Sequence, residues 1–167
     1  MKEAPARKVL VVGLGNPDRG DDGVGPVVAR ELSGVLPTDV ATTWPSGDAL
    51  SLIAAWSGFD AVIFIDAAAP ARTPGRIHRF DLAKTELPRG LNYASSHALS
   101  VADAIGLARV LRQAPQDIIV YAVEGASFAC GAPMTPEVAD AAVKVTGRVV
   151  AEVARLRQSA NELTADA

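Results

Sequence analysis

Several functional classes need residues that this sequence contains in small number or not at all. Cys130 is the only cysteine among 167 residues, so neither an internal disulfide nor a cysteine-rich zinc site is possible. Aromatic residues make up 5%, too few for a base-stacking platform. The formal net charge of -3 gives no general basic face for nucleic acid. No apolar run approaches the ~18 residues that span a bilayer, and residues 1–8 lack the apolar core of a secretory signal. We expect a soluble, cytoplasmic protein that binds neither nucleic acid nor membrane.

The composition is typical of a folded domain. Hydrophobic residues make up 49% and charged residues 21% of the chain, a balance that favours a globular protein. A length of 167 residues suits one domain with a core of its own. We predict a single domain over residues 1–167, with frayed ends at 1–7 and 159–167.

Apolar runs typical of strands alternate with patterns typical of helices. Strands are predicted at residues 9–14, 40–44, 61–65, 76–81 and 118–123, and helices at 23–33, 49–56, 95 or 96 to about 112, and 135 to about 157. In the helix over 49–56, Leu50, Ile53 and Ala54 are expected to face the core. This order predicts a three-layer α/β/α sandwich with a mostly parallel sheet.

Polar residues follow several of these strands. Because ligands of open α/β sheets bind at the carboxyl ends of the strands, we take the following as candidates: Asp21, Asp22, Asp66, Glu124 and, at the start of a helix, His97.

Each candidate also has a structural interpretation. Asp66 is favoured for function because the next residues, 67–70, offer no helix for it to cap. Of the adjacent pair, Asp21 is the better candidate for a cap, which leaves Asp22 for a site. Glu124 either lines the cleft or bonds the turn at 125–127. His78 belongs to a charged strand and is expected at the solvated surface.

Two carboxylates and one imidazole form a ligand set that suits a divalent transition metal and leaves coordination positions open. The sequence does not favour a nucleotide-binding site. Asp18 occupies the place of the third glycine in a dinucleotide-binding fingerprint, and no Gly-Lys-Ser/Thr phosphate loop exists. Nothing marks Cys130 as an activated nucleophile, so a loop or buried thiol is the simpler interpretation.

Three motifs in order resemble those of the hydrogenase maturation endopeptidases: residues 13–25 (Gly-Leu-Gly-Asn-Pro-Asp-Arg-Gly-Asp-Asp-Gly-Val-Gly), 65–67 (Ile-Asp-Ala) and 95–99 (Ser-Ser-His-Ala-Leu). The resemblance implies a five-stranded sheet with one antiparallel strand, a role that suits residues 76–81. It also implies that Asp22, Asp66 and His97 are the metal ligands and, through the metal, the catalytic residues.

The resemblance further implies a substrate and a mechanism. The partner would be the precursor of a nickel-iron hydrogenase large subunit, which supplies the nickel and loses a short C-terminal tail. The protein would act as a monomer. Two alternatives stay open at this point. A nickel-dependent assembly chaperone would use the same three residues without cleavage. Residues 13–17 also resemble the start of peptidyl-tRNA hydrolases, although this chain has Gly-Asp-Asp-Gly at 20–23 where those proteins carry an Arg-His-Asn element.

Overall fold

A mixed sheet organises the chain. The computed structural model describes residues 6–45, 49–69, 72–88, 92–93 and 101–162. The five strands of the main path are β2 (Ala41–Thr43), β1 (Val9–Gly13), β3 (Ala61–Ala69), β6 (Asp117–Glu124) and β4 (Ile77–Asp81), in that spatial order. All pairs are parallel except β4 with β6. The two-residue strand β5 (Asn92–Tyr93) adds an antiparallel pair at the end of β3.

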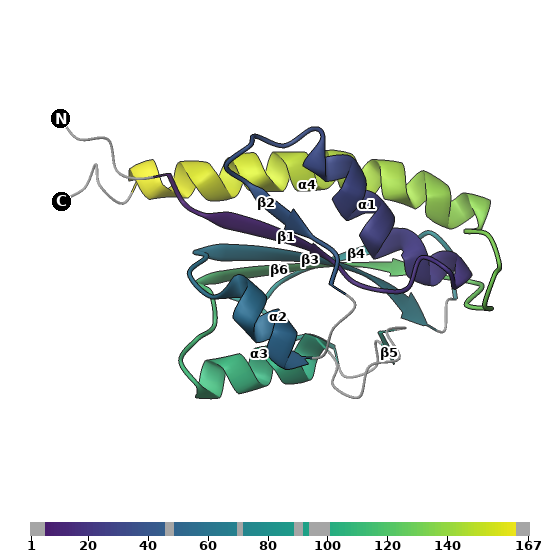
Figure 1. Ribbon diagram of the computed structural model, residues 1–167, viewed down its shortest axis with the longest axis horizontal. Helices are drawn as coiled ribbons and strands as arrows, with labels where there is room; N and C mark the ends of the chain where they lie inside the picture. The colour runs from purple at the N-terminus through teal and green to yellow at the C-terminus, as the bar shows by residue number, and fades with distance from the viewer. Residues whose placement is uncertain (1–5, 46–48, 70–71, 89–91, 94–100, 163–167) are drawn as a thin grey trace.

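Helices cover both faces of this sheet (Figure 1). On one face α1 (Val24–Ser33) packs against α4 (Pro136–Glu162), and on the other α2 (Ala49–Trp56) packs against α3 (Val101–Val110). A short 3-10 turn, η1 (Gly20–Gly23), precedes α1. The predicted three-layer sandwich, with its mostly parallel sheet and an antiparallel strand at residues 77–81, is therefore confirmed.

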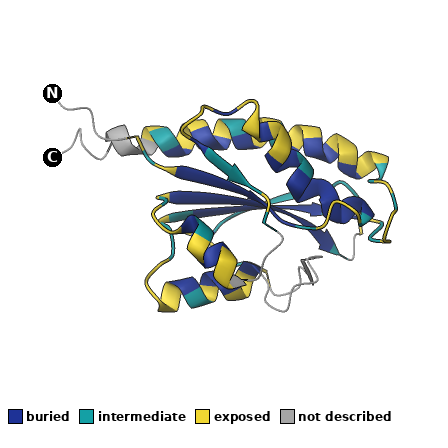
Figure 2. Cartoon of the chain, in the orientation of Figure 1, coloured by how far each residue is buried: buried dark blue, intermediate teal, exposed yellow. Residues whose placement is uncertain are grey.

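The central strands β1, β3 and β6 are buried because both of their faces carry apolar side chains, whereas β2 and β4 are only partly buried (Figure 2). In β3, Ile63 and Ile65 belong to the core beneath α1 and α4, whereas Val62 and Phe64 belong to the core beneath α2 and α3. Trp56 of α2 packs edge-on against Phe64, with ring centroids 5.6 Å apart. The side chains of β3 thus alternate strictly between the two cores.

Some local predictions were wrong. In α2 the buried side chains are Leu52, Ile53 and Trp56, while Leu50 is 63% exposed and Ala54 is also exposed. Nearly every residue of this helix is apolar, so the pattern could not specify its inner face. The helix predicted over residues 23–33 is confirmed as α1, but α4 continues to residue 162, beyond the predicted end near 157.

Glycines allow α1 to begin directly against the strand ends. A Cβ atom on Gly25 would lie 2.2 Å from the carbonyl oxygen of Leu14 and 2.5 Å from that of Ile65. A Cβ atom on Gly13 would lie 2.2 Å from the carbonyl oxygen of Gly25. Because only hydrogen fits in these gaps, the start of α1 and the preceding η1 are held at the ends of β1 and β3.

Candidate functional site

The connection that follows β1 and the connection that precedes β3 run over opposite faces of the sheet. From β1 it passes through η1 and α1 to β2, and from β2 it returns through α2 to β3 on the opposite face of the sheet. The crossovers therefore diverge between β1 and β3, at their carboxyl ends. In open α/β sheets this divergence leaves a crevice in which ligands bind. Both predicted aspartates, Asp22 and Asp66, lie at this edge.

Asp22 stands on η1 with its side chain buried; it is 1% exposed. Its Oδ2 accepts a hydrogen bond of 3.1 Å from the backbone N–H of Asn16, and Arg19 Nη1 lies 3.7 Å from the same oxygen. Gly15, with a φ of +121°, is so close that a Cβ atom there would lie 1.9 Å from the Asp22 carbonyl oxygen. The loop after β1 thus fixes the carboxylate, and the positive charge of Arg19 offsets its burial.

Asp66 is fully buried within β3, where it pairs with Ala122 of β6. The expectation that Asp66 ends the strand was wrong, because β3 continues to residue 69 through pairing with β5 and β6. Its neighbour β1, however, stops at this level: Leu14 donates the last hydrogen bond, to the carbonyl oxygen of Ile65. Strand alternation directs Asp66 toward the face that carries α2 and α3, and its Oδ1 accepts a 2.8 Å bond from the N–H of Ala67.

Asp21 has a structural role, as expected, but it does not cap the helix that follows it. Its Oδ2 accepts hydrogen bonds from the N–H groups of Ala126 and Ser127, and its Oδ1 accepts from the N–H and hydroxyl of Thr135. The carboxylate therefore joins η1 to the loop after β6 and to the residue before α4. Burial alone would raise the pKa of Asp21, but these hydrogen bonds outweigh it and the pKa is lowered.

Glu124, at the end of β6, is bonded to the loop before β4. Its Oε2 accepts from the N–H groups of Arg72 and Thr73, and its Oε1 lies 2.7 Å from His78 Nε2. These contacts lower the pKa of Glu124, with the His78 hydrogen bond as the largest cause. The expectation that Glu124 bonds the turn at 125–127 was wrong, since Asp21 does so. The solvated-surface interpretation of His78 was also wrong: its side chain is 23% exposed and paired.

The third predicted ligand, His97, lies outside the described residues. Within the described part of the chain, no group of three or more His, Cys, Asp or Glu side chains could hold a metal ion. Asp22 and Asp66 lie toward the carboxyl ends of the neighbouring strands β1 and β3. The three-residue ligand set stays a prediction. Oxygen ligands from two buried carboxylates would favour a cation over an anion at this edge.

Cys130 is exposed in the loop between β6 and α4. The N–H of the next residue, Gly131, donates to the carbonyl oxygen of Asp18, so this loop lies beside the loop that precedes η1. No described helix is long and apolar enough to cross a membrane.

Two further charged residues escaped the sequence-based prediction. Arg19 reaches Asp22 at a spacing of three residues, a spacing that brings side chains together on a helical turn. Glu152 of α4 is 6% exposed and is bonded to Arg79, Tyr121 and Arg155. A signal for Glu152 existed, because it interrupts the apolar stripe of the last helix between Val149 and Leu156.

Residues 47–152, more than half of the chain, match the family model described as HycI, hydrogenase maturation protease. The chain belongs to the hydrogenase maturation protease family. It is therefore a hydrolase of the endopeptidase class, and the family-level prediction is confirmed. No curated protein matches the sequence.

Solved structures of hydrogenase maturation proteases share the fold. The endopeptidase HybD from E. coli superposes with a TM-score of 0.71 at 22% identity, over 89% of this chain and 93% of that one. HybD from Thermococcus kodakarensis gives 0.67 at 21% identity, over 85% and 96%. HycI from T. kodakarensis gives 0.65 at 24% identity, over 90% and 94%. At these identities the similarity establishes the fold alone.

Proposed function

We propose that this protease removes a short C-terminal tail from the precursor of a nickel-iron hydrogenase large subunit, acting as a monomer in the cytoplasm. Membership of the maturation protease family supports the reaction class. The observation that carries the proposal is that two buried carboxylates lie near the divergence between β1 and β3: Asp22 on η1, after β1, and Asp66 within β3. A peptide bound across this edge would bring its scissile bond to both carboxylates.

The nickel ion belongs to the substrate in this proposal. The precursor would deliver it, and the oxygens of Asp22 and Asp66 together with the imidazole of His97 would complete its coordination. This donor set fits the group, because carboxylate and imidazole ligands suit borderline divalent metals and buried carboxylates favour a cation. With three protein ligands, free nickel would bind weakly, so the protein would not remove nickel from other sites. Titration of the isolated protein with nickel tests this point, since binding as tight as that of a dedicated nickel carrier contradicts it.

The reaction is hydrolysis of one peptide bond. Water oxygen adds to the carbonyl carbon, the C–N bond breaks, and the amine of the tail leaves with a proton. The metal would supply charge stabilisation for this step. Asp22 and Asp66 would hold the docked segment in register with the crevice, while the loop at residues 14–16 fixes Asp22. Peptides without bound nickel would not be cut, because they lack the group that the three ligands recognise.

The test is the C-terminal mass of a nickel-loaded large-subunit precursor after incubation with the protease. The wild-type protein should release the tail, whereas Asp22→Asn, Asp66→Asn and His97→Ala should slow release at least 100-fold. Asp140→Asn, an exposed aspartate on α4, is the matched control and should cleave at the wild-type rate. Stable binding of the precursor without cleavage by the wild type would instead identify a chaperone. Normal cleavage by the Asp66 variant would remove that residue from the site.

A further inference from the structure

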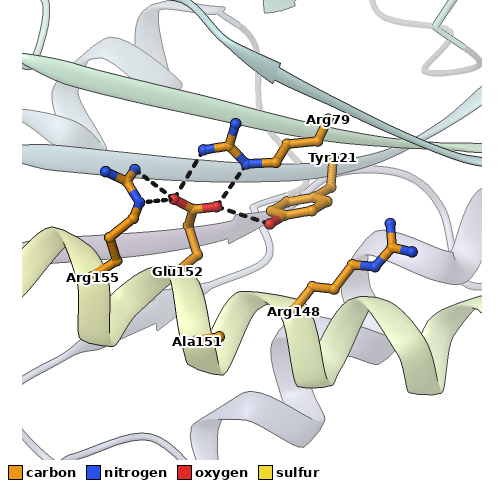
Figure 3. A pocket seen from close by; sticks show the side chains of 6 residues that line it. All are labelled: Arg79, Tyr121, Arg148, Ala151, Glu152 and Arg155. Carbon is orange, nitrogen blue, oxygen red and sulfur yellow. Dashed lines mark hydrogen bonds and ion pairs between the residues drawn. The ribbon is translucent and has the colours of Figure 1, made fainter.

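A hollow of about 400 Å³ lies between α4 and the sheet, away from the carboxylates of the proposed site. It is lined by Arg79 of β4, Tyr121 of β6 and four residues of α4: Arg148, Ala151, Glu152 and Arg155. Figure 3 shows Arg148 and Arg155 rising from the helix on either side of Ala151 and Glu152. The helix positions 148, 152 and 155 share one face because they are four and three residues apart, and the small side chain of Ala151 leaves the space open.

Arginine side chains outnumber carboxylates in the lining of the hollow. Arg79 donates to Glu152 from Nε and Nη2 at 2.7 and 3.0 Å, and Arg155 donates to the same carboxylate from Nε at 2.8 Å. Tyr121 completes the set with a hydroxyl bond of 3.0 Å. Three guanidiniums and one carboxylate thus line the hollow. Arg148 makes no hydrogen bond or ion pair with any residue that the structure describes.

These charges persist across the pH range in which proteins work. Burial raises the pKa of Glu152, but the bonds from Arg79, Arg155 and Tyr121 outweigh it and bring the pKa to about 2. Burial, reinforced by the charge of Glu152, raises the pKa of Tyr121 to about 12. The carboxylate therefore stays ionised and the phenol stays neutral, so the hollow keeps the same charge from mildly acidic to alkaline pH.

We propose that this arginine-lined hollow is a second binding site, which holds a carboxylate group of an acidic segment of the protein substrate. Guanidinium groups match carboxylates through paired N–H donors, and Glu152 already shows that a carboxylate fits between Arg79 and Arg155. Arg148 offers the donors for a second carboxylate. The inference rests on the proposed function for its source of ligand, because a protease that acts on a large precursor needs contacts beyond the scissile bond.

The hollow lies within reach of a docked polypeptide. Arg79 pairs with Tyr121, one residue before the Ala122 that pairs with Asp66, so the two sites are nearly level along the strands. They are separated by two strand spacings, about 10 Å, and by the thickness of the sheet. In the part of the chain that the structure describes, β4 is the last strand on its side. An extended segment that passes around this open edge could contact both sites.

Direct binding tests the hollow without any need for proteolytic activity. The probe is a blocked tetraglutamate peptide, titrated at constant ionic strength while the arginine Nε–H resonances of the whole protein are followed by NMR. We expect saturable shifts at Arg79 and Arg148. Arg148→Gln should weaken binding at least five-fold, and so should Ala151→Leu, which fills the space without changing charge. Lys144→Gln removes a charge from an exposed position one turn away on the same helix and should leave the affinity within two-fold.

Three results of this titration would overturn the proposal. They are shifts that do not saturate, an equal loss in the Lys144 variant, and tighter binding of inorganic phosphate than of the peptide. The precursor then tests the source of the ligand. Arg148→Gln should raise KM for precursor cleavage at least five-fold with kcat unchanged, and an unchanged KM contradicts the assignment. If the wild-type protein binds the peptide but cleaves no precursor, the proposed function fails while the carboxylate-binding hollow stands.

Discussion

Replacement of Asp21 by asparagine tests the structural role of Asp21 separately from the role proposed for Asp22. In the wild type, Oδ2 accepts from the N–H groups of Ala126 and Ser127 at 2.7 and 2.9 Å, and Oδ1 accepts from Thr135 N–H at 2.7 Å and from its hydroxyl at 2.9 Å. Asparagine has one acceptor oxygen. In either orientation its NH2 group faces at least one backbone N–H that has lost its acceptor.

The magnitude follows from these bonds. Each buried donor left without an acceptor costs about 1–3 kcal/mol, and bonds to a charged acceptor lie at the upper end. Depending on the orientation of the amide, one or two backbone donors lose their acceptor. The remaining hydrogen bonds no longer have a charged acceptor. We expect Asp21→Asn to lower the free energy of unfolding by about 3–5 kcal/mol at pH 7. Urea denaturation followed by circular dichroism measures this, with Asp140→Asn as the control.

The pH dependence gives a second check. Because the folded-state pKa of Asp21 is lowered, its stabilisation is complete above the unfolded pKa of about 3.9 and is lost as the pH falls through the folded value. The difference between wild type and variant should therefore be constant from about pH 5 to 8 and shrink below about pH 4. A variant within 1 kcal/mol of the wild type at pH 7 would refute this account of the Asp21 contacts.

Four other substitutions test separate parts of the structure. Gly25→Ala should lower the free energy of unfolding by more than about 2 kcal/mol because its Cβ meets backbone oxygens. Gly147→Ala, which has open space in α4, should raise the free energy of unfolding by up to about 1 kcal/mol. The two melting temperatures should therefore move in opposite directions. Glu152→Gln should cost about 2 kcal/mol at pH 7. That difference should fade between about pH 4.5 and 2, as measured by urea titration. Cys130→Ser should cleave precursor at the wild-type rate, and loss of cleavage would indicate a thiol mechanism.

The central strands were predictable because burial on both faces requires continuous apolar runs, which the chain shows at residues 9–12 and 61–65. The inner face of α2 was not, because a helix apolar all round is placed by its neighbours. The position of Asp22 after β1 followed from the order of elements, but the continuation of β3 past Asp66 did not, because it depends on pairing with β5 and β6. The partners of Asp21 did not, since they lie 105 to 114 residues away along the chain, and no local pattern encodes such a pairing.

The Asp21 contacts also bear on when the protein becomes competent during synthesis. The carboxylate emerges from the ribosome 114 residues before Thr135, one of its partners. Until that threonine has been synthesised, the turn that carries Asp22 lacks the hydrogen bonds that Thr135 donates to Asp21. Long-range pairing thus delays completion of this turn until residue 135 and the helix that follows it have been synthesised.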